Sequence, residues 1–282
     1  MKRINLILIL ILACSSFSCS REDATVNYTD LKTAELLTNV SYGEDDRQVF
    51  DIYLPANRSA KSTKTLVLIH GGAWIEGDKS DMLALMKVLQ DKLPDYAIVN
   101  MNYRLATIDN PALPMQINDI STIINTLKVK NYGISNEFGL IGASAGGHLA
   151  LLYTYALKNK EIKMVCSLVG PTNLADDNYT EDQKFSTLFR IVTGVPYKNN
   201  ENYYKQLSPL YQVTNQAPPT LLFYGNQDPL VPIRQAFELN SKLDTLQVYQ
   251  EKYIYNTGHG NWSNSDLDHI NKKLVTFINQ KF

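Results

Sequence analysis

A serine flanked by glycines is the residue of this sequence best placed to act as a nucleophile. Gly142-Ala143-Ser144-Ala145-Gly146 has the spacing G-x-S-x-G, with an apolar, strand-like run before the serine (138–143) and a helical pattern after it (145–158). At such a junction a serine lies on a sharp, exposed turn from which it can attack a carbonyl carbon. Because a chain of this length contains the pattern by chance roughly one time in ten, other residues must supply a base, an acid and a site for the developing negative charge.

An acid and a base follow the serine along the chain. Asp228 lies just past an apolar run (220–225), and His259 lies in a glycine-rich loop after the next expected strand. In a triad the imidazole takes the serine proton during attack, and the carboxylate holds the imidazole in the required tautomer and orientation. We therefore predict a catalytic triad of Ser144, Asp228 and His259. The other three histidines lie in a glycine-rich turn or inside expected helices: His70, His148 and His269.

A glycine-rich turn upstream can supply the site for negative charge. An apolar run (65–70) ends in His70-Gly71-Gly72-Ala73-Trp74. Glycine allows backbone N–H groups to approach a ligand closely, and two such groups directed at a carbonyl oxygen form an oxyanion hole. The N–H of Ala145 lies at the start of the next helix, where negative charge is favoured.

Strands and helices alternate along the chain that must position these residues. Several expected strands are apolar on both faces, which is typical of parallel strands covered by helices on both sides. This alternation predicts an α/β fold with a mostly parallel central sheet flanked by helices. The expected strands are 49–55, 65–70, 96–103, 138–143, 163–170, 220–225 and 246–255, and the expected helices are 80–93, 115–128, 145–158, 232–243 and 266–282.

One long segment interrupts the alternation. Residues 174–213 are polar and aromatic, and they form too long a stretch for a simple connection. We expect a partly helical cap, inserted before the strand at 220–225. The alternative is an ordinary elaboration whose aromatic rings join the core.

The N-terminus has the features of a secretory signal. Lys2 and Arg3 precede an apolar run (4–13) that is too short to span a bilayer permanently, and small residues follow it. A small residue before Cys14 or Cys19 resembles the lipidation site of bacterial lipoproteins, and we favour Cys19 because Ser-Arg-Glu-Asp follows it. We expect a signal (1–19), a tether and N-terminal extension (20–41) and one catalytic domain (42–282). The expected location is the outer membrane or cell surface, with the periplasm as the alternative, and the lipid anchor would be the only membrane contact.

The composition is that of an ordinary globular protein. Of the 282 residues 44% are hydrophobic and 20% are charged, and the formal net charge is −1. Without a basic stripe, nucleic acid is not an expected partner. Cys166 lies in an apolar run and is expected to be buried and inert, and no spacing of metal ligands is evident.

Taken together, the motifs resemble the α/β-hydrolase superfamily, specifically the hormone-sensitive-lipase-like esterases and their bacterial branch of feruloyl and acetyl xylan esterases. The resemblance runs from about residue 42 to the end, and the motifs that carry it are LVLIHGGAWIEGDKSD, VNMNYRLA, LIGASAGGHLALL, YGNQDPLVP and TGHGNW. It implies the triad named above and an oxyanion hole from the N–H groups of Gly72, Ala73 and Ala145. Tyr103 and Arg104 are expected to orient the oxyanion turn.

The resemblance also implies an activity, to which two alternatives remain. The expected activity is that of a serine carboxylesterase, which hydrolyses short-chain or glycan-linked acyl esters through an acyl-enzyme without cofactor or metal. Many relatives have H-G-G-G where this chain has Ala73 and Trp74, a variant also found in kynurenine-formamidase-like enzymes, so an arylformamidase is the alternative. A non-catalytic glycan-binding protein with a retained hydrolase fold is the alternative of another class. Trp74 either lines the substrate pocket or packs the turn against the core.

Overall fold

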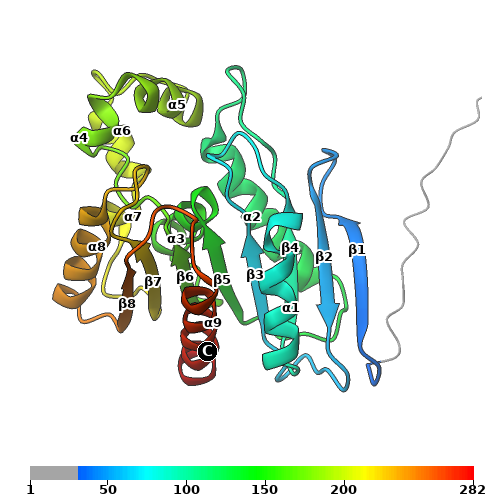
Figure 1. The fold of residues 1–282 in the computed structure, drawn as a ribbon. Helices are drawn as coiled ribbons and strands as arrows, with labels where there is room; N and C mark the ends of the chain where they lie inside the picture. Colours follow the sequence, from blue (N-terminus) through cyan, green and yellow to red (C-terminus); the bar gives the residue numbers. More distant parts are fainter. Residues whose placement is uncertain (1–30) are drawn as a thin grey trace, which may run out of the picture.

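The computed structural model describes residues 31–282, which form a single eight-stranded sheet with helices on both faces (Figure 1). The signal, Cys14, Cys19 and residues 20–30 of the expected tether and extension lie outside the described residues. The strand order is β1-β2-β4-β3-β5-β6-β7-β8. Strand β2 runs antiparallel to both of its neighbours, and the pairs from β4 to β8 are parallel. The strands are β1 (Glu35–Ser41), β2 (Val49–Leu54), β3 (Thr65–Ile69), β4 (Ala97–Met101), β5 (Phe138–Ala143), β6 (Ile162–Leu168), β7 (Thr220–Gly225) and β8 (Gln250–Tyr255).

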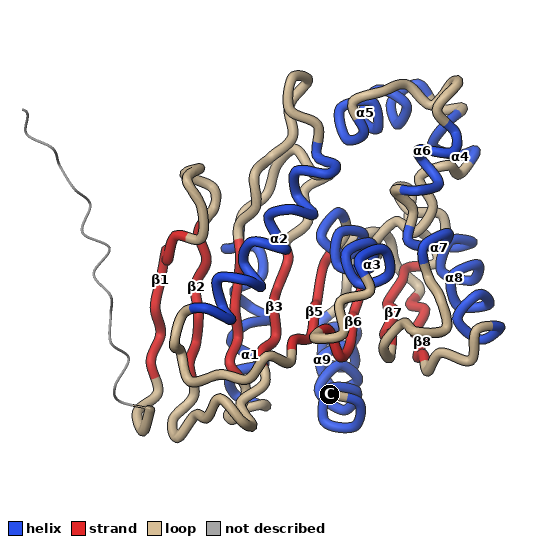
Figure 2. The backbone as a smooth tube through the Cα atoms, turned by 180° about the vertical axis from the view of Figure 1, so that it is seen from behind, coloured by secondary structure: helices blue, strands red, loops and turns tan. Residues whose placement is uncertain are grey.

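Helices cover the two faces of the sheet in separate layers. Figure 1 shows α1 and α9 in front of the sheet, and Figure 2, from behind, shows α2 and α3 on the opposite face. The side chains of β3 alternate between the layers, because successive residues of a strand point to opposite faces. Leu66 and Leu68 pack with the α1 and α9 side, whereas Val67 and Ile69 pack with the α2 and α3 side. The helices are η1 (Lys79–Met82), α1 (Leu83–Lys92), α2 (Ala112–Val129), α3 (Ala145–Leu157), α8 (Ile233–Thr245) and α9 (Asn264–Lys281).

The sequence predictions of an α/β-hydrolase fold and a mostly parallel sheet are confirmed, with one correction at the sheet edge. The expected extension (20–41) ends in β1, which pairs antiparallel with β2 and therefore belongs to the sheet. All seven residues of β1 are partly or fully exposed, and its sequence lacks the apolar alternation by which a half-buried strand is recognised.

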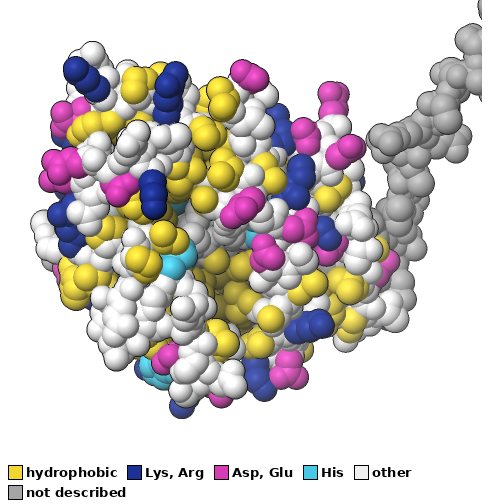
Figure 3. Space-filling view, turned by 45° about the horizontal axis from the view of Figure 1, so that its top comes forward, with side chains coloured by type: hydrophobic (Ala, Val, Ile, Leu, Met, Phe, Trp, Pro, Cys, Tyr) yellow, Lys and Arg dark blue, Asp and Glu magenta, His cyan; other side chains and the backbone are white. Residues whose placement is uncertain are grey.

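The segment expected to be a cap contains four short helices between β6 and β7. They are α4 (Asp177–Thr180), α5 (Gln183–Thr193), α6 (Glu201–Gln206) and α7 (Pro209–Gln212). In Figure 1, α4, α5 and α6 lie beyond the carboxyl ends of the parallel strands, and in Figure 3 apolar side chains gather along a hollow on this side. The segment is partly helical, as expected. The alternative also holds in part, because the rings of Tyr179, Phe189 and Tyr204 are buried in the same cluster as scaffold residues.

None of the helices between residues 31 and 282 combines the length and apolar character that crossing a lipid bilayer requires.

Candidate active site

Ser144 lies on a strained turn between β5 and α3. Its backbone angles are φ 52° and ψ −119°, a conformation that residues with a side chain rarely adopt. The N–H of Ser144 donates to the carbonyl of Leu168 on β6 at 2.7 Å, and its carbonyl accepts from the N–H of His148 at 3.0 Å, the first bond of α3. The surrounding structure thus holds the strain, as is typical of functional turns.

The two glycines around the serine are required by space. A Cβ atom on Gly142 would lie 2.1 Å from the carbonyl oxygen of Gly146. A Cβ on Gly146 would lie 2.2 Å from the carbonyl oxygen of Ile69 and 2.3 Å from that of His70. The start of α3 therefore packs backbone against backbone on the end of β3.

The predicted acid, base and nucleophile form one hydrogen-bonded chain. The Nε2 atom of His259 lies 2.8 Å from the Oγ atom of Ser144, and its Nδ1 lies 2.7 Å from Oδ2 of Asp228. The other oxygen of Asp228 accepts from the N–H groups of Leu230 at 2.8 Å and Val231 at 3.0 Å.

The burial of Asp228 and the partial exposure of His259 suit proton transfer within the triad. The side chain of Asp228 is fully buried and that of His259 is 21% exposed. Since a carboxylate only accepts hydrogen bonds, Nδ1 carries a proton and Nε2 is free to accept the proton of the serine. This arrangement can activate Ser144 as a nucleophile.

The glycine-rich turn after β3 lies directly beside the serine. A Cβ on Gly71 would be 3.2 Å from the Cβ of Ser144. Three consecutive residues then have positive φ: Gly72 at 109°, Ala73 at 48° and Trp74 at 65°. Ala73 lines a pocket together with Ser144. The N–H of Ala145, the first residue of α3, has no intrahelical partner because no turn precedes it.

Side chains from neighbouring elements hold this turn in place. The Tyr103 hydroxyl donates to the carbonyls of His70 at 2.9 Å and Gly71 at 3.2 Å, and its ring stacks on that of His70 with centroids 4.2 Å apart. The Gln116 amide donates to the carbonyls of Trp74 at 2.7 Å and Arg104 at 2.8 Å. Tyr103 thus contacts the turn as predicted. The Arg104 guanidinium bonds Asp119 instead, and Arg104 reaches the turn only through Gln116.

Three supports of the turn were missed in the sequence. The Arg47 guanidinium donates to the carbonyl of Gly77 at 2.7 Å, and the buried carboxylate of Asp119 pairs with Arg104 at 2.6 Å. Gln116 is the third. These residues come from a loop and from a polar part of α2, where single polar side chains give no distinctive pattern. Gln116 and Asp119 are distinguished by their burial, which the sequence does not display.

The pocket at Ser144 is small and mostly apolar. Its volume is about 130 Å³, and it lies between the scaffold and the cap. Among the described residues, the lining residues besides Ala73, Ser144 and His259 are Trp74, Pro171, Tyr179, Phe185, Leu188, Phe189, Leu230 and Val231. The cap therefore supplies most of one wall.

Trp74 both packs the turn against the core and lines the pocket. It is 3% exposed, and its ring makes edge contacts with His148 at 5.2 Å and with Phe189 of the cap at 5.7 Å between centroids. It is also one of the residues that line the pocket. One side of Trp74 therefore packs, while another borders the space in front of Ser144.

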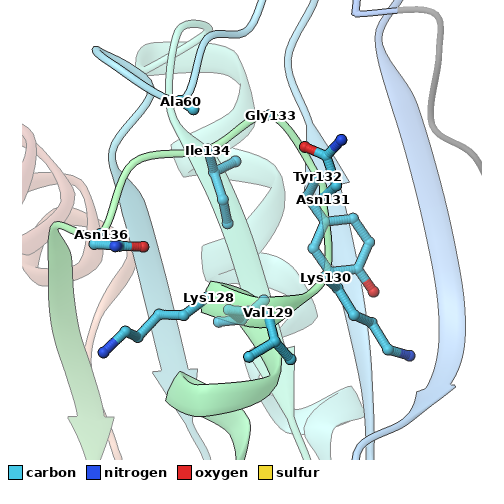
Figure 4. A pocket seen from close by; sticks show the side chains of 10 residues that line it. Ala60, Lys128, Val129, Lys130, Asn131, Tyr132, Gly133, Ile134 and Asn136 are labelled. Atoms are coloured by element: carbon cyan, nitrogen blue, oxygen red, sulfur yellow. The ribbon is translucent and has the colours of Figure 1, made fainter.

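A larger cavity, of about 280 Å³, lies at the other end of the strands from Ser144 (Figure 4). It is formed by the loop between α2 and β5 (130–137), the end of α2 and Ala60, which place it at the amino ends of the parallel strands. Ligands of open α/β sheets bind at the carboxyl ends. The smaller pocket is therefore the candidate active site, because it contains the hydrogen-bonded serine.

The chain is similar to known proteins in sequence and in structure. The model of the BD-FAE family matches residues 50–243. The esterase LipC of Mycobacterium tuberculosis (strain ATCC 25618 / H37Rv) is 25% identical over 240 residues, which cover 78% of this chain and 59% of LipC. This chain thus spans about three fifths of the length of that curated relative.

Two solved structures share the fold. A bifunctional GH43-CE protein of Bacteroides eggerthii matches with a TM-score of 0.73 and 22% identity, over 87% of this chain and 38% of that one. A truncated form of a carbohydrate esterase from gut microbiota also matches with a TM-score of 0.73, at 19% identity, over 89% of this chain and 98% of that one.

Proposed function

The chain belongs to the BD-FAE family, and from the geometry of its site we propose that it is a serine carboxylesterase that hydrolyses short-chain or glycan-linked acyl esters. The observation that carries the proposal is the unbroken chain of hydrogen bonds from Asp228 through His259 to Ser144, at the mouth of an apolar pocket.

In the first half-reaction Ser144 Oγ attacks the ester carbonyl carbon while Nε2 of His259 takes the hydroxyl proton. The negative charge that develops on the carbonyl oxygen is stabilised by the N–H groups of Ala73 and Ala145, with that of Gly72 as the third candidate. The intermediate collapses, the C–O bond to the alcohol breaks, and His259 gives its proton to the departing oxygen. Asp228 stabilises the imidazolium throughout.

In the second half-reaction a water molecule attacks the acyl-Ser144 ester. His259 now removes a proton from this water and returns it to Ser144 Oγ as the acyl–oxygen bond breaks. The carboxylic acid leaves and the free serine is restored, so that the cycle consumes one water per ester.

The size of the pocket supports a small acyl group. Its volume of about 130 Å³ is close to that of the ~150 Å³ apolar protein cavity that binds benzene. An acetyl or butyryl chain, or a single aromatic ring, is of this order. The proposal of a glycan-linked ester draws support from the carbohydrate esterase that shares the fold.

An ester panel tests this proposal. We expect hydrolysis of p-nitrophenyl acetate, and Ser144→Ala should lower kcat by at least ~10⁴-fold, because removal of the nucleophile leaves only binding and oxyanion stabilisation. Full activity of Ser144→Ala would overturn the assignment.

The other substrates of the panel separate the alternatives. Acetylated xylan and methyl ferulate test glycan-linked acyl groups, and N-formylkynurenine tests for an arylformamidase. A preference for N-formylkynurenine over every ester would replace the proposed activity. Binding of xylan without turnover of any substrate would favour the non-catalytic alternative.

We further propose, from the sequence alone, that lipidation of Cys19 anchors the exported protein to a membrane surface. Retention of Cys19→Ala in the membrane fraction would contradict this choice.

A further inference from the structure

His148 is a buried histidine that the proposed reaction does not use. It lies on α3, one helical turn beyond Ser144, and is 0% exposed. Its Nε2 lies 2.8 Å from the carbonyl oxygen of Leu207, and its Nδ1 accepts from the indole N–H of Trp74 at 3.2 Å. Because an indole nitrogen only donates and a carbonyl only accepts, His148 is neutral with its proton on Nε2.

The two partners of His148 belong to the cap segment and to the oxyanion turn. Leu207 ends α6 and is part of the cap. Trp74 belongs to the oxyanion turn, where its carbonyl is held by the N–H of Ala106 at 2.9 Å and by Gln116. The indole N–H is buried, so its loss of an acceptor would carry a desolvation cost. His148 is therefore the polar link between the cap and the ring of Trp74.

We propose, on the basis of the proposed esterase function, that His148 is a positioning residue that holds Trp74 as a rigid wall of the acyl pocket and thereby limits the length of the acyl chain. The backbone of Trp74 is already fixed, so the position of its ring depends on His148 and on the edge contact with Phe189. When His148 cannot accept from the indole, the ring loses its polar anchor and shifts away from Ser144, which lengthens the pocket. The oxyanion donor Ala73, one residue earlier, is held by the backbone of the turn and stays in place.

His148→Phe tests the link, with His269→Phe as the matched control. His269 also bonds an aromatic side chain, the Tyr255 hydroxyl at 2.9 Å, but it lies on α9, on the opposite face of the sheet from α3 and His148. The readout is the ratio of kcat/KM for p-nitrophenyl hexanoate to that for the acetate. We expect a rise of about tenfold in His148→Phe, the order expected when a hydrophobic pocket gains room for additional methylene groups. His269→Phe should leave the ratio unchanged.

A pair of polar variants keeps the test valid if the Phe variant does not fold. The amide of His148→Gln offers one acceptor and one donor and can serve both Trp74 and Leu207, so the ratio should stay near that of the parent. His148→Asn is too short to reach both partners, so the ratio should rise. Equal, parental ratios in the Asn and Gln variants, or a parental ratio in a folded Phe variant, would overturn the proposal.

A spectroscopic readout is independent of the reaction. In a Trp262→Phe background, Trp74 is the only tryptophan of the chain. His148→Phe should shift its emission to longer wavelength and increase its quenching by acrylamide, whereas unchanged emission would overturn the positioning role. If the parent protein hydrolyses no ester, the proposed function fails, and the emission alone decides whether His148 positions Trp74.

Discussion

The two walls of the pocket are built by different kinds of contact. On the sheet side, backbone meets backbone: Gly146 lies on the carbonyls at the end of β3, and the N–H of Ser144 bonds β6. On the cap side, side chains meet side chains. The rings of Tyr179, Phe185 and Phe189 contact one another with centroids 4.8 to 6.3 Å apart.

This difference separates the reaction from the choice of substrate. A backbone contact admits no added atom, so the sheet side fixes the serine and the oxyanion donors in one geometry. An aromatic side chain can be replaced by another apolar side chain without any change in the main chain, and cores tolerate such substitutions when the total volume is roughly kept. We therefore expect changes on the sheet side to abolish function and changes on the cap side to alter selectivity.

The largest expected effect is that of Gly146→Ala. The new Cβ would lie 2.2 Å from the carbonyl oxygen of Ile69, and backbone atoms must move to admit it. We expect a loss of about 3 kcal/mol or more in the free energy of unfolding, at the upper end for overpacking, together with loss of esterase activity. Urea unfolding and p-nitrophenyl acetate turnover measure both.

Gly260→Ala is the matched control for that substitution. A Cβ at Gly260 meets nothing within 4 Å, although this residue adjoins the same site. Its stability should change by less than about 0.5 kcal/mol. A Gly146→Ala protein as stable and active as Gly260→Ala would remove the basis for the comparison of the walls.

The next effect concerns the residue that links the walls. Burial lowers the pKa of His148 to about 4, although its bond to the Leu207 carbonyl acts in the opposite direction. In the unfolded chain a histidine titrates near ~6.5. Between these values the unfolded state binds the extra proton, so the free energy of unfolding falls as the pH decreases from ~6.5 to 4, by about 3 kcal/mol in total.

Urea unfolding at pH 7, 5 and 4 measures this contribution when the parent is compared with His148→Gln. The pKa of His70 is also lowered by burial, and the subtraction removes its contribution because both proteins retain it. Between pH 7 and pH 4 the free energy of unfolding of the variant should therefore decrease by about 3 kcal/mol less than that of the parent. Parallel pH profiles would show that His148 is not held neutral by the fold.

The smallest expected effect is that of Phe185→Ala in the cap. The substitution enlarges the pocket and should shift the preference for hexanoate over acetate by about tenfold, with the acetate rate little changed. Phe237→Ala is the control, because this ring is 51% exposed on α8 and does not line the pocket. Equal substrate profiles for the two variants would show that the cap does not set selectivity.

The sequence predicted the scaffold side of this comparison well. Ser144 and Asp228 each follow an apolar run, and His259 lies in a glycine-rich loop after the next strand. The carboxyl ends of parallel strands meet at one end of a sheet. Spacing and residue type were therefore sufficient to predict the triad, although its residues are up to 115 positions apart in the sequence.

The cap side and the supports of the turn were much less predictable. The link from Trp74 through His148 to Leu207 joins three segments through single side chains, and within its own helix His148 is one polar residue among apolar neighbours. The cap helices are short, so their packing depends on tertiary contacts more than on local pattern.

Covalent labelling of the nucleophile tests the central claim most directly. The protein is incubated with a fluorophosphonate, and the modified peptide is identified by mass spectrometry alongside residual esterase activity. The account predicts one covalent adduct, on Ser144, formed in proportion to the loss of activity and absent in Ser144→Ala. An adduct on another residue that removes the activity, or full activity after Ser144 is modified, would contradict it.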